Sequence, residues 1–175
     1  QVLSKSSSLP FDAAYAIESF LHMPGAGQFF ASAARLIASG GGLLVCDAVL
    51  DDGAGRGASA PTRSGIPAGR TAPGPTRRLI SRFIRGWQVR SLYTFSDLKT
   101  EAETGGFTLE EVLDLTPYLE LNRPRDLLIR AAVTVLGRLP WRSPFWLNML
   151  GGDALQRLLL RGDLRYMLLR FRKTG

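Results

Sequence analysis

Two apolar segments near the front of the chain, separated by about one helix length, constrain the fold more than any other feature. The first runs from Phe11 to Met23 and the second from Leu43 to Leu50. Apolar residues between them recur at helical spacing, which predicts a β-α-β unit with parallel strands. Ligands of an open parallel sheet bind outside the carboxyl ends of its strands. His22 follows the first predicted strand and Asp47 closes the second, so both fall where chemistry is expected.

The same reasoning assigns most of the remaining chain to alternating strands and helices. Residues Gly40–Gly42 should stop the first helix, because glycine adopts the left-handed conformation at a helix end without a Cβ penalty. Thr94 and Asp97 have the spacing of a capping box at the start of a helix. The predicted strands are 11–18, 43–50, 107–115 and 164–172, and the predicted helices begin at 26 and cover 77–90, 95–104, 125–137 and 153–161.

Residues 53–76 consist of Gly, Ala, Pro, Ser, Thr and Arg, with Ile66 as the only large apolar side chain. Such a stretch cannot bury enough surface to offset its ordering entropy. We therefore expect a flexible loop or lid within a single domain that spans residues 1–175. The segment 141–150 is apolar enough to line a pocket or contact a partner, although core packing is the simpler interpretation.

The charge and cysteine content narrow the classes of partner. The chain carries 22 Lys and Arg against 15 Asp and Glu, giving a net charge of +7. These cations are scattered rather than arranged in blocks or interleaved with aromatic residues, so we expect no nucleic-acid and no membrane partner. One cysteine excludes an internal disulfide and fits a reducing, cytoplasmic location. One histidine and one cysteine do not support a structural zinc site, and no metal is expected.

Five stretches resemble, in order and spacing, the C-terminal part of class I S-adenosylmethionine-dependent methyltransferases. Leu9–Ala13 resembles the approach to the family's fourth strand, and Glu18–Pro24 resembles the E-S-x-x-H-M turn of small-molecule and sugar O-methyltransferases. Ala34–Gly41 resembles the end of the helix before strand five, Cys46–Asp47 the close of that strand, and Gly105–Phe107 the start of strand six. The resemblance implies an α/β, Rossmann-like sheet built from strands four to seven.

The resemblance also implies a function and roles for particular residues. It implies methyl transfer from S-adenosylmethionine to a hydroxyl of a small natural-product or sugar acceptor, with His22 as general base and Asp47 as its helper. Histidine suits proton transfer because its protonation changes near neutral pH. Some relatives have a second histidine where this chain has Leu21, so His22 is the sole candidate. The residues that border the methionine part of the cofactor would be Ala16, Ile17, Glu18 and Ser19.

Simpler interpretations of these residues stay open. A single histidine after a strand is often structural, Asp47 could cap the following turn, and Glu18 could be a solvated loop residue. Trp87 and Tyr93 could roof a substrate pocket or belong to the core.

The glycine-rich turn that cradles the cofactor in this family does not precede Ser8. Gly53–Gly57 has the glycine spacing of such a turn, but it follows the predicted strand 43–50 and is followed by prolines rather than by a helix. With the family's strand order 3-2-1-4-5-7-6, strand four would present an unpaired edge. We therefore expect a piece of a longer enzyme that alone binds cofactor poorly and is inactive. The alternative is a non-catalytic half-domain that pairs with another chain, or with itself, through this edge.

Overall fold

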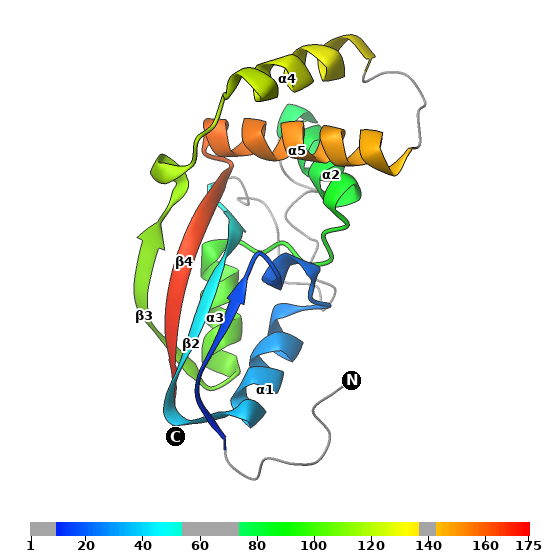
Figure 1. Ribbon diagram of the computed structural model, residues 1–175. Helices are drawn as coiled ribbons and strands as arrows, with labels where there is room; N and C mark the ends of the chain where they lie inside the picture. The colour runs from blue at the N-terminus through cyan, green and yellow to red at the C-terminus, as the bar shows by residue number, and fades with distance from the viewer. Residues whose placement is uncertain (1–9, 54–73, 137–142) are drawn as a thin grey trace.

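A computed structural model describes residues 10–53, 74–136 and 143–175. Its strands form one mixed sheet in the order β1-β2-β4-β3 (Figure 1). Strand β1 lies parallel to β2, whereas β4 runs antiparallel to both β2 and β3. This arrangement confirms the α/β fold and corresponds to the expected order 4-5-7-6. The strands are β1 (Phe11–Ile17), β2 (Ile37–Leu50), β3 (Phe107–Asp114) and β4 (Leu164–Lys173).

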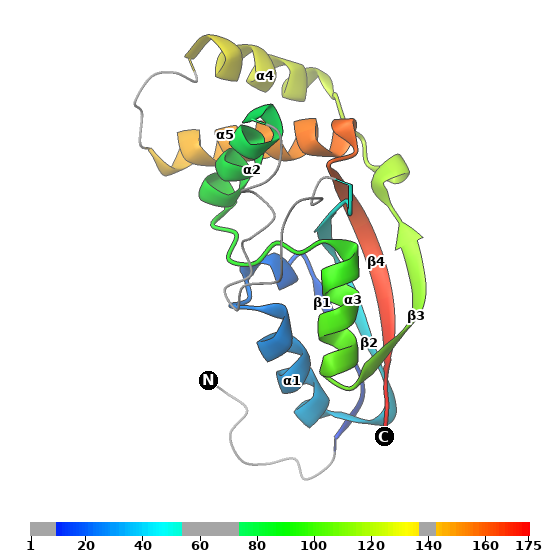
Figure 2. The same cartoon turned by 180° about the vertical axis from the view of Figure 1, so that it is seen from behind.

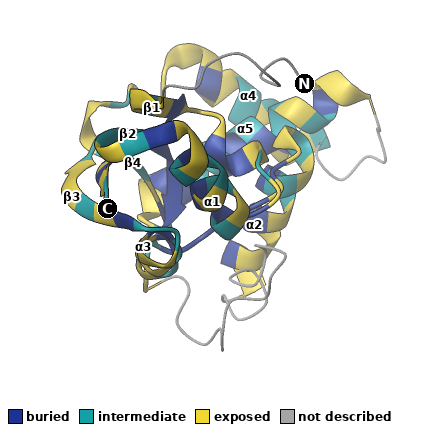
Figure 3. Ribbon diagram, turned by 90° about the horizontal axis from the view of Figure 1, so that it is seen from below, coloured by how far each residue is buried: buried dark blue, intermediate teal, exposed yellow. Residues whose placement is uncertain are grey.

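Two helices cover one face of the sheet (Figure 2). They are α1 (Ala26–Leu36) and α3 (Phe95–Thr104), the latter capped by a hydrogen bond from the Asp97 N–H to the Thr94 hydroxyl at 3.1 Å. Phe30 lies at the centre of the core beneath them, fully buried among the rings of Phe20, Phe107 and Phe171. Viewed from below, the buried residues gather between the sheet and these helices (Figure 3).

The other face of the sheet carries exposed apolar side chains. Ile17, Cys46, Leu168 and Leu113 are successive cross-strand partners and so share this face. Ile17 is 53% exposed and Leu113 is 45% exposed, while Tyr15, two residues before Ile17, is 77% exposed. Among the described residues, β1 pairs only with β2. The sheet therefore has one covered face, one open face and an unpaired edge at β1.

A second helical layer lies at the carboxyl ends of β1 and β2 (Figure 1). It consists of α2 (Gly74–Trp87), α4 (Pro124–Leu136) and α5 (Pro144–Arg161). Helices α2 and α5 bury a separate apolar cluster against the end of the sheet. The members of this cluster from the two helices are Leu79, Ile80, Phe83, Ala154, Leu158 and Leu159.

Several predicted boundaries are wrong, those of α2 and α5 among them. Residues 74–76 belong to α2 rather than to the predicted loop, of which 54–73 lie outside the described residues. Helix α5 begins at Pro144, nine residues before the predicted start at 153. Its first turn is capped by Ser143, whose hydroxyl accepts a hydrogen bond from the Trp146 N–H at 3.2 Å. Proline is compatible with the first turn, because its missing N–H would have no helical partner there.

The glycines Gly40–Gly42 do not stop the first helix, which ends at Leu36. Ile37 already pairs with Phe11 in the sheet, and the register then jumps so that Gly42 pairs with Ala13. The glycines permit this irregularity: Gly40 has a φ of +76°, and a Cβ on Gly41 would lie 2.7 Å from the Asp12 carbonyl oxygen. The buried Ile37 therefore decides where the helix ends, and the glycines shape the strand.

Helices α2 and α5 cross at two glycines, and this contact yields a testable prediction. A Cβ on Gly151 would lie 2.7 Å from Trp87 Cδ1 and 2.9 Å from Gly86 Cα, whereas one on Gly152 would meet nothing closer than 4.0 Å. We expect Gly151→Ala to destabilise the chain by about 1–3 kcal/mol through overpacking. The control Gly152→Ala should be neutral or stabilising by up to about 1 kcal/mol, because alanine favours a helix over glycine. Urea denaturation distinguishes them, and equal effects would contradict this account of the crossing.

Candidate functional site

The carboxyl end of β1 carries Glu18 in an uncommon backbone conformation. Its φ is +48°, in the left-handed region that a residue with a side chain seldom adopts. The Glu18 N–H still donates to the Cys46 carbonyl oxygen at 2.9 Å, so the residue is anchored to β2. Strained residues of this kind cluster at binding sites, where the surrounding structure holds them in place. The conformation therefore supports a functional role for the strand end.

His22 lies on a short 3-10 turn, η1 (Phe20–His22), which backbone hydrogen bonds hold firmly. The Leu21 carbonyl oxygen accepts from the N–H groups of Arg90, at 2.8 Å, and Ser91, at 3.1 Å. Phe20 and Leu21 are buried, whereas His22 is exposed. The turn thus presents the imidazole from a fixed backbone.

Asp47 is buried, with 4% of its surface exposed, and its carboxylate holds the turn that carries His22. Oδ2 accepts from the Leu21 N–H at 3.1 Å, and Oδ1 accepts from the Ala48 N–H at 2.9 Å. Burial raises the pKa of the Asp47 carboxyl above its ordinary value, and the hydrogen bonds from Ala48 and Leu21 offset part of the rise. Asp47 therefore acts on the position of His22 through the backbone of Leu21.

The raised pKa of Asp47 gives a prediction for the dependence of stability on pH. The folded state binds the proton of this carboxyl more tightly than the unfolded state, in which the carboxyl has its ordinary pKa of 3.8. The stability that Asp47 contributes is therefore greatest below pH 3.8 and is lost as pH rises through the raised pKa of the folded state. We expect the unfolding free energy of the unchanged chain, measured in urea relative to Asp47→Asn, to fall with pH over this window. A difference that rises with pH would contradict the burial argument.

Tyr166 of β4 reaches the same region and contacts Glu18. Its hydroxyl donates to Glu18 Oε1 at 3.1 Å. Burial, with smaller effects of Cys46 and Glu18, raises the pKa of the Tyr166 phenol above its ordinary value, which keeps it protonated as a donor. The contact joins residues that are 148 positions apart in the sequence.

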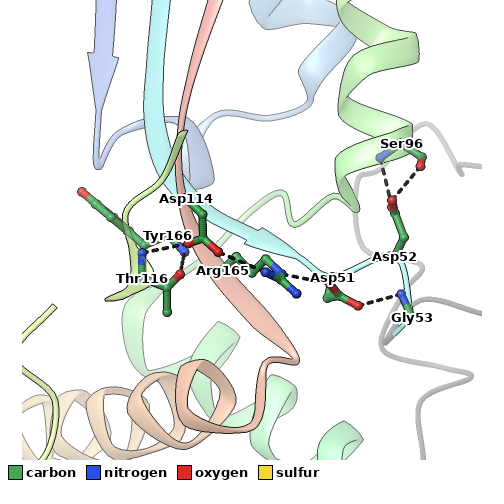
Figure 4. A network of polar contacts seen from close by, with 8 residues as sticks. All are labelled: Asp51, Asp52, Gly53, Ser96, Asp114, Thr116, Arg165 and Tyr166. Atoms are coloured by element: carbon green, nitrogen blue, oxygen red, sulfur yellow. Dashed lines mark hydrogen bonds and ion pairs between the residues drawn. The ribbon is translucent and has the colours of Figure 1, made fainter. Parts of the chain in front are cut away.

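A polar network at the start of β4 fixes the backbone of Tyr166 (Figure 4). The Tyr166 N–H donates to the Thr116 hydroxyl at 2.8 Å, and the Thr116 N–H donates to Asp114 at 2.8 Å. Arg165 completes the network by donating to both Asp114 and Asp51, each at 3.0 Å. These contacts tie the ends of β2 and β3 to the beginning of β4.

A cavity of about 500 Å³ lies at the carboxyl ends of β1 and β2. Glu18, His22, Asp47 and Tyr166 form its polar end. Apolar side chains from η1, α2, α5 and the segment after β3 form much of the rest, namely Leu21, Phe83, Trp87, Leu119, Leu121, Leu155 and Leu159.

The structure therefore brings together His22, Asp47 and Glu18 of the predicted site residues. Ala16, Ile17 and Ser19 lie beside them at the end of β1 and do not line the cavity. Trp87 does line it, whereas Tyr93 is buried in the core, where its hydroxyl accepts a hydrogen bond from the Ala26 N–H at 3.0 Å. Sequence reasoning missed Tyr166. The period-2 pattern of β4 indicated its face of the strand, but its pairing with Ala48 is a long-range feature.

In residues 10–53, 74–136 and 143–175, no three His, Cys, Asp or Glu side chains are grouped as a metal ion would require. In the same part of the chain, no helix has the length and apolar character needed to cross a bilayer.

Neither a protein-family model nor a curated protein matches this sequence. Solved structures do match its fold. A cyclopropane synthase from Mycobacterium tuberculosis shares 17% identity with a TM-score of 0.61, and the match covers 94% of this chain and 56% of that one. The geranyl diphosphate C-methyltransferase of Streptomyces coelicolor A3(2), solved with S-adenosyl-L-homocysteine, shares 13% identity with a TM-score of 0.60 over 97% and 51% of the two chains.

A phosphoethanolamine N-methyltransferase of Haemonchus contortus, also solved with S-adenosylhomocysteine, matches with 14% identity and a TM-score of 0.57, over 94% of this chain and 34% of that one. The chain spans about half the length of most of the solved structures it matches. At these identities the likeness concerns the fold. The chain has an α/β fold with a four-stranded mixed sheet that matches about half of the Rossmann-like fold of the solved methyltransferases.

Proposed function

We propose that this chain is the acceptor-binding part of an S-adenosylmethionine-dependent methyltransferase that methylates a hydroxyl of a small natural-product or sugar acceptor. The observation that carries the proposal is the cavity that both His22 and Asp47 line at the carboxyl ends of two parallel strands. Ligands of such sheets bind at this edge. A carboxyl with a pKa perturbed by burial, next to a cavity, is also a mark of a functional site.

The residues at the end of β1 fit one side of a cofactor site. Glu18 and Ser19 are exposed there, and the Ser19 side chain is not used to cap η1. Together with the backbone of Ala16 and Ile17, they would border the polar methionine part of S-adenosylmethionine. This cofactor, when bound, supplies a methyl group on a positively charged sulfonium. The glycine-rich turn and the ribose-binding carboxylate of the family would come from sequence outside this chain.

The role of His22 follows from the chemistry of methyl transfer. The acceptor oxygen forms a bond to the methyl carbon while the bond from that carbon to sulfur breaks, and the hydroxyl proton must leave. His22 would take this proton as general base. Asp47 would keep the turn, and hence the imidazole, in place by holding the Leu21 N–H. The cavity would align the hydroxyl with the methyl group, and alignment is the larger part of such catalysis.

The experiment that tests this function extends the chain N-terminally with the preceding in-frame coding sequence. The extended chain is incubated with methyl-tritiated S-adenosylmethionine and a panel of alcohols and sugars. We expect label in an ether product, and we expect none with the 175-residue chain alone. Transfer of label only to amines or carbon acceptors would show that the hydroxyl assignment is wrong.

A second candidate function is a non-catalytic half-domain that pairs through its open sheet edge. The observation in its favour is the exposure of Phe11, Tyr15 and Ile17 along β1, at 48%, 77% and 53%. An unpaired strand that carries apolar side chains is a template for association. A partner that supplies the missing strands would cover both this edge and the open face.

Self-association of the purified chain tests this second function. We expect the chain to form dimers or larger species through β1, and we expect Ile17→Lys to shift it toward monomer, since a lysine on an edge strand opposes pairing. Leu36→Lys, at a 45% exposed position on α1, is the matched control and should leave the mass unchanged. Light scattering after size exclusion gives the mass. A monomer at all concentrations would count against association through the edge.

A further inference from the structure

A second cavity, of about 410 Å³, adjoins the first between α4 and α5. The two cavities share five lining residues, so they meet along a common wall. Trp87 and Leu155 provide the apolar part of this wall, and Gln156, Arg125 and Asp126 complete it. Beyond the wall, the second cavity is lined by Ile129 of α4 and by Phe145 and Met149 of α5. We call the two adjoining cavities together the elongated space, and His22 lines only the first of them.

The charged side chains in the walls are paired with one another. Arg125 lies 3.5 Å from Asp126, whose other oxygen accepts from the Arg123 N–H at 3.2 Å. Arg123 in turn pairs with Glu120 at 2.5 Å. Each of these four charged side chains therefore lies beside an opposite charge.

The far end of the space shows the same pairing. Asp153, which lines the second cavity, lies 2.9 Å from the Arg157 guanidinium and 3.6 Å from that of Arg130. Helix α4 forms the outer wall of the second cavity. It packs little against the rest of the protein, because only Asp126 and Val133 among its residues are buried. The charged side chains that line the second cavity, Arg125, Asp126 and Asp153, therefore each lie beside an opposite charge.

We infer that the acceptor is an elongated, neutral alcohol, with its hydroxyl at His22 and an apolar body that extends past Trp87 into the space between α4 and α5. This inference deepens the proposed function and rests on it for the role of His22. A compact acceptor would fill only the first cavity. An apolar body would gain binding free energy in both cavities, because each methylene group removed from water makes binding more favourable.

Binding of n-alkan-1-ols to the purified chain tests the inference without cofactor or turnover. Calorimetric titration with hexan-1-ol, decan-1-ol and dodecan-1-ol should show an affinity that rises by about fourfold for each added methylene. Ile129→Trp fills the second cavity and should weaken dodecan-1-ol by about tenfold or more, the equivalent of about two methylenes. The same variant should leave hexan-1-ol, which the first cavity accommodates, unchanged.

Val135→Trp is the matched control, since Val135 lies on the same helix, is 75% exposed and lines neither cavity. It should bind every alcohol as the unchanged chain does. Should Ile129→Trp fail to fold by circular dichroism, Met149→Trp fills the same cavity from α5. An affinity that stops rising beyond hexan-1-ol, or an equal loss of short and long alcohols in the cavity variants, would overturn the inference. Because no methyl transfer is measured, these results are independent of whether the extended chain is a methyltransferase.

Discussion

Replacing His22 with alanine in the N-terminally extended chain should lower turnover by about 10²–10⁴-fold, the range that a positioned general base contributes. The binding of S-adenosylmethionine should change little, because the residues proposed to border the cofactor are Ala16, Ile17, Glu18 and Ser19 and do not include His22. The fold should also be preserved, since His22 is exposed and the turn is held through Leu21 rather than through the imidazole. Single-turnover assays with labelled cofactor measure the first effect, and calorimetry measures the second.

Gln28→Ala is a suitable control for this experiment. Gln28 is exposed on α1 and lines neither cavity, so its removal should leave turnover and cofactor binding unchanged. Unchanged turnover in His22→Ala would remove the general-base assignment. Equal losses of turnover and cofactor binding would instead indicate that His22 has a structural role.

Replacing Phe30 with alanine should lower the unfolding free energy by about 3–5 kcal/mol, as expected for the truncation of a fully buried aromatic residue. The Phe30 ring is 0% exposed, and its centroid lies 5.3 Å from that of Phe171 and 5.8 Å from that of Phe107. It therefore joins α1 to β3 and β4 at once. Urea denaturation followed by circular dichroism gives the change.

Leu36→Ala is the matched control on the same helix. Leu36 is 45% exposed, so its truncation should cost far less than that of Phe30. Similar losses for the two variants would show that α1 is not held by the aromatic cluster.

The elements that hydrophobic periodicity defines were predictable from the sequence. Residues 43–50 of β2 are apolar on both faces, as a central strand requires, and the helix of Phe30 follows the helical spacing. The spacing of Thr94 and Asp97 predicted the start of α3 correctly, since the helix begins at Phe95 directly after the capping residue Thr94. Local patterns of this kind are predictive because the interactions that cause them join residues close together in the sequence, and these interactions are kept in the folded chain.

The features that depend on distant contacts were not predictable. Pro144 and the glycines at 151 and 152 argue against a helix locally, yet proline suits the first turn and Gly151 is needed where α5 crosses Gly86 of α2. The hydrogen bond of Tyr166 to Glu18 depends on the pairing of β4 with β2. The hydrogen bond from the Leu21 N–H to the Asp47 carboxylate likewise depends on how η1 folds back over β2.

Under the proposed function, this chain supplies the acceptor side of a methyltransferase, and the side that cradles the cofactor lies in sequence outside it. Calorimetric titration of S-adenosylhomocysteine tests this claim most directly, because it needs no knowledge of the acceptor. The chain extended by its preceding coding sequence is compared with the 175-residue chain. We predict saturable binding at one site per extended chain and weak or undetectable binding by the shorter one. An extended, folded chain that does not bind S-adenosylhomocysteine would contradict the claim.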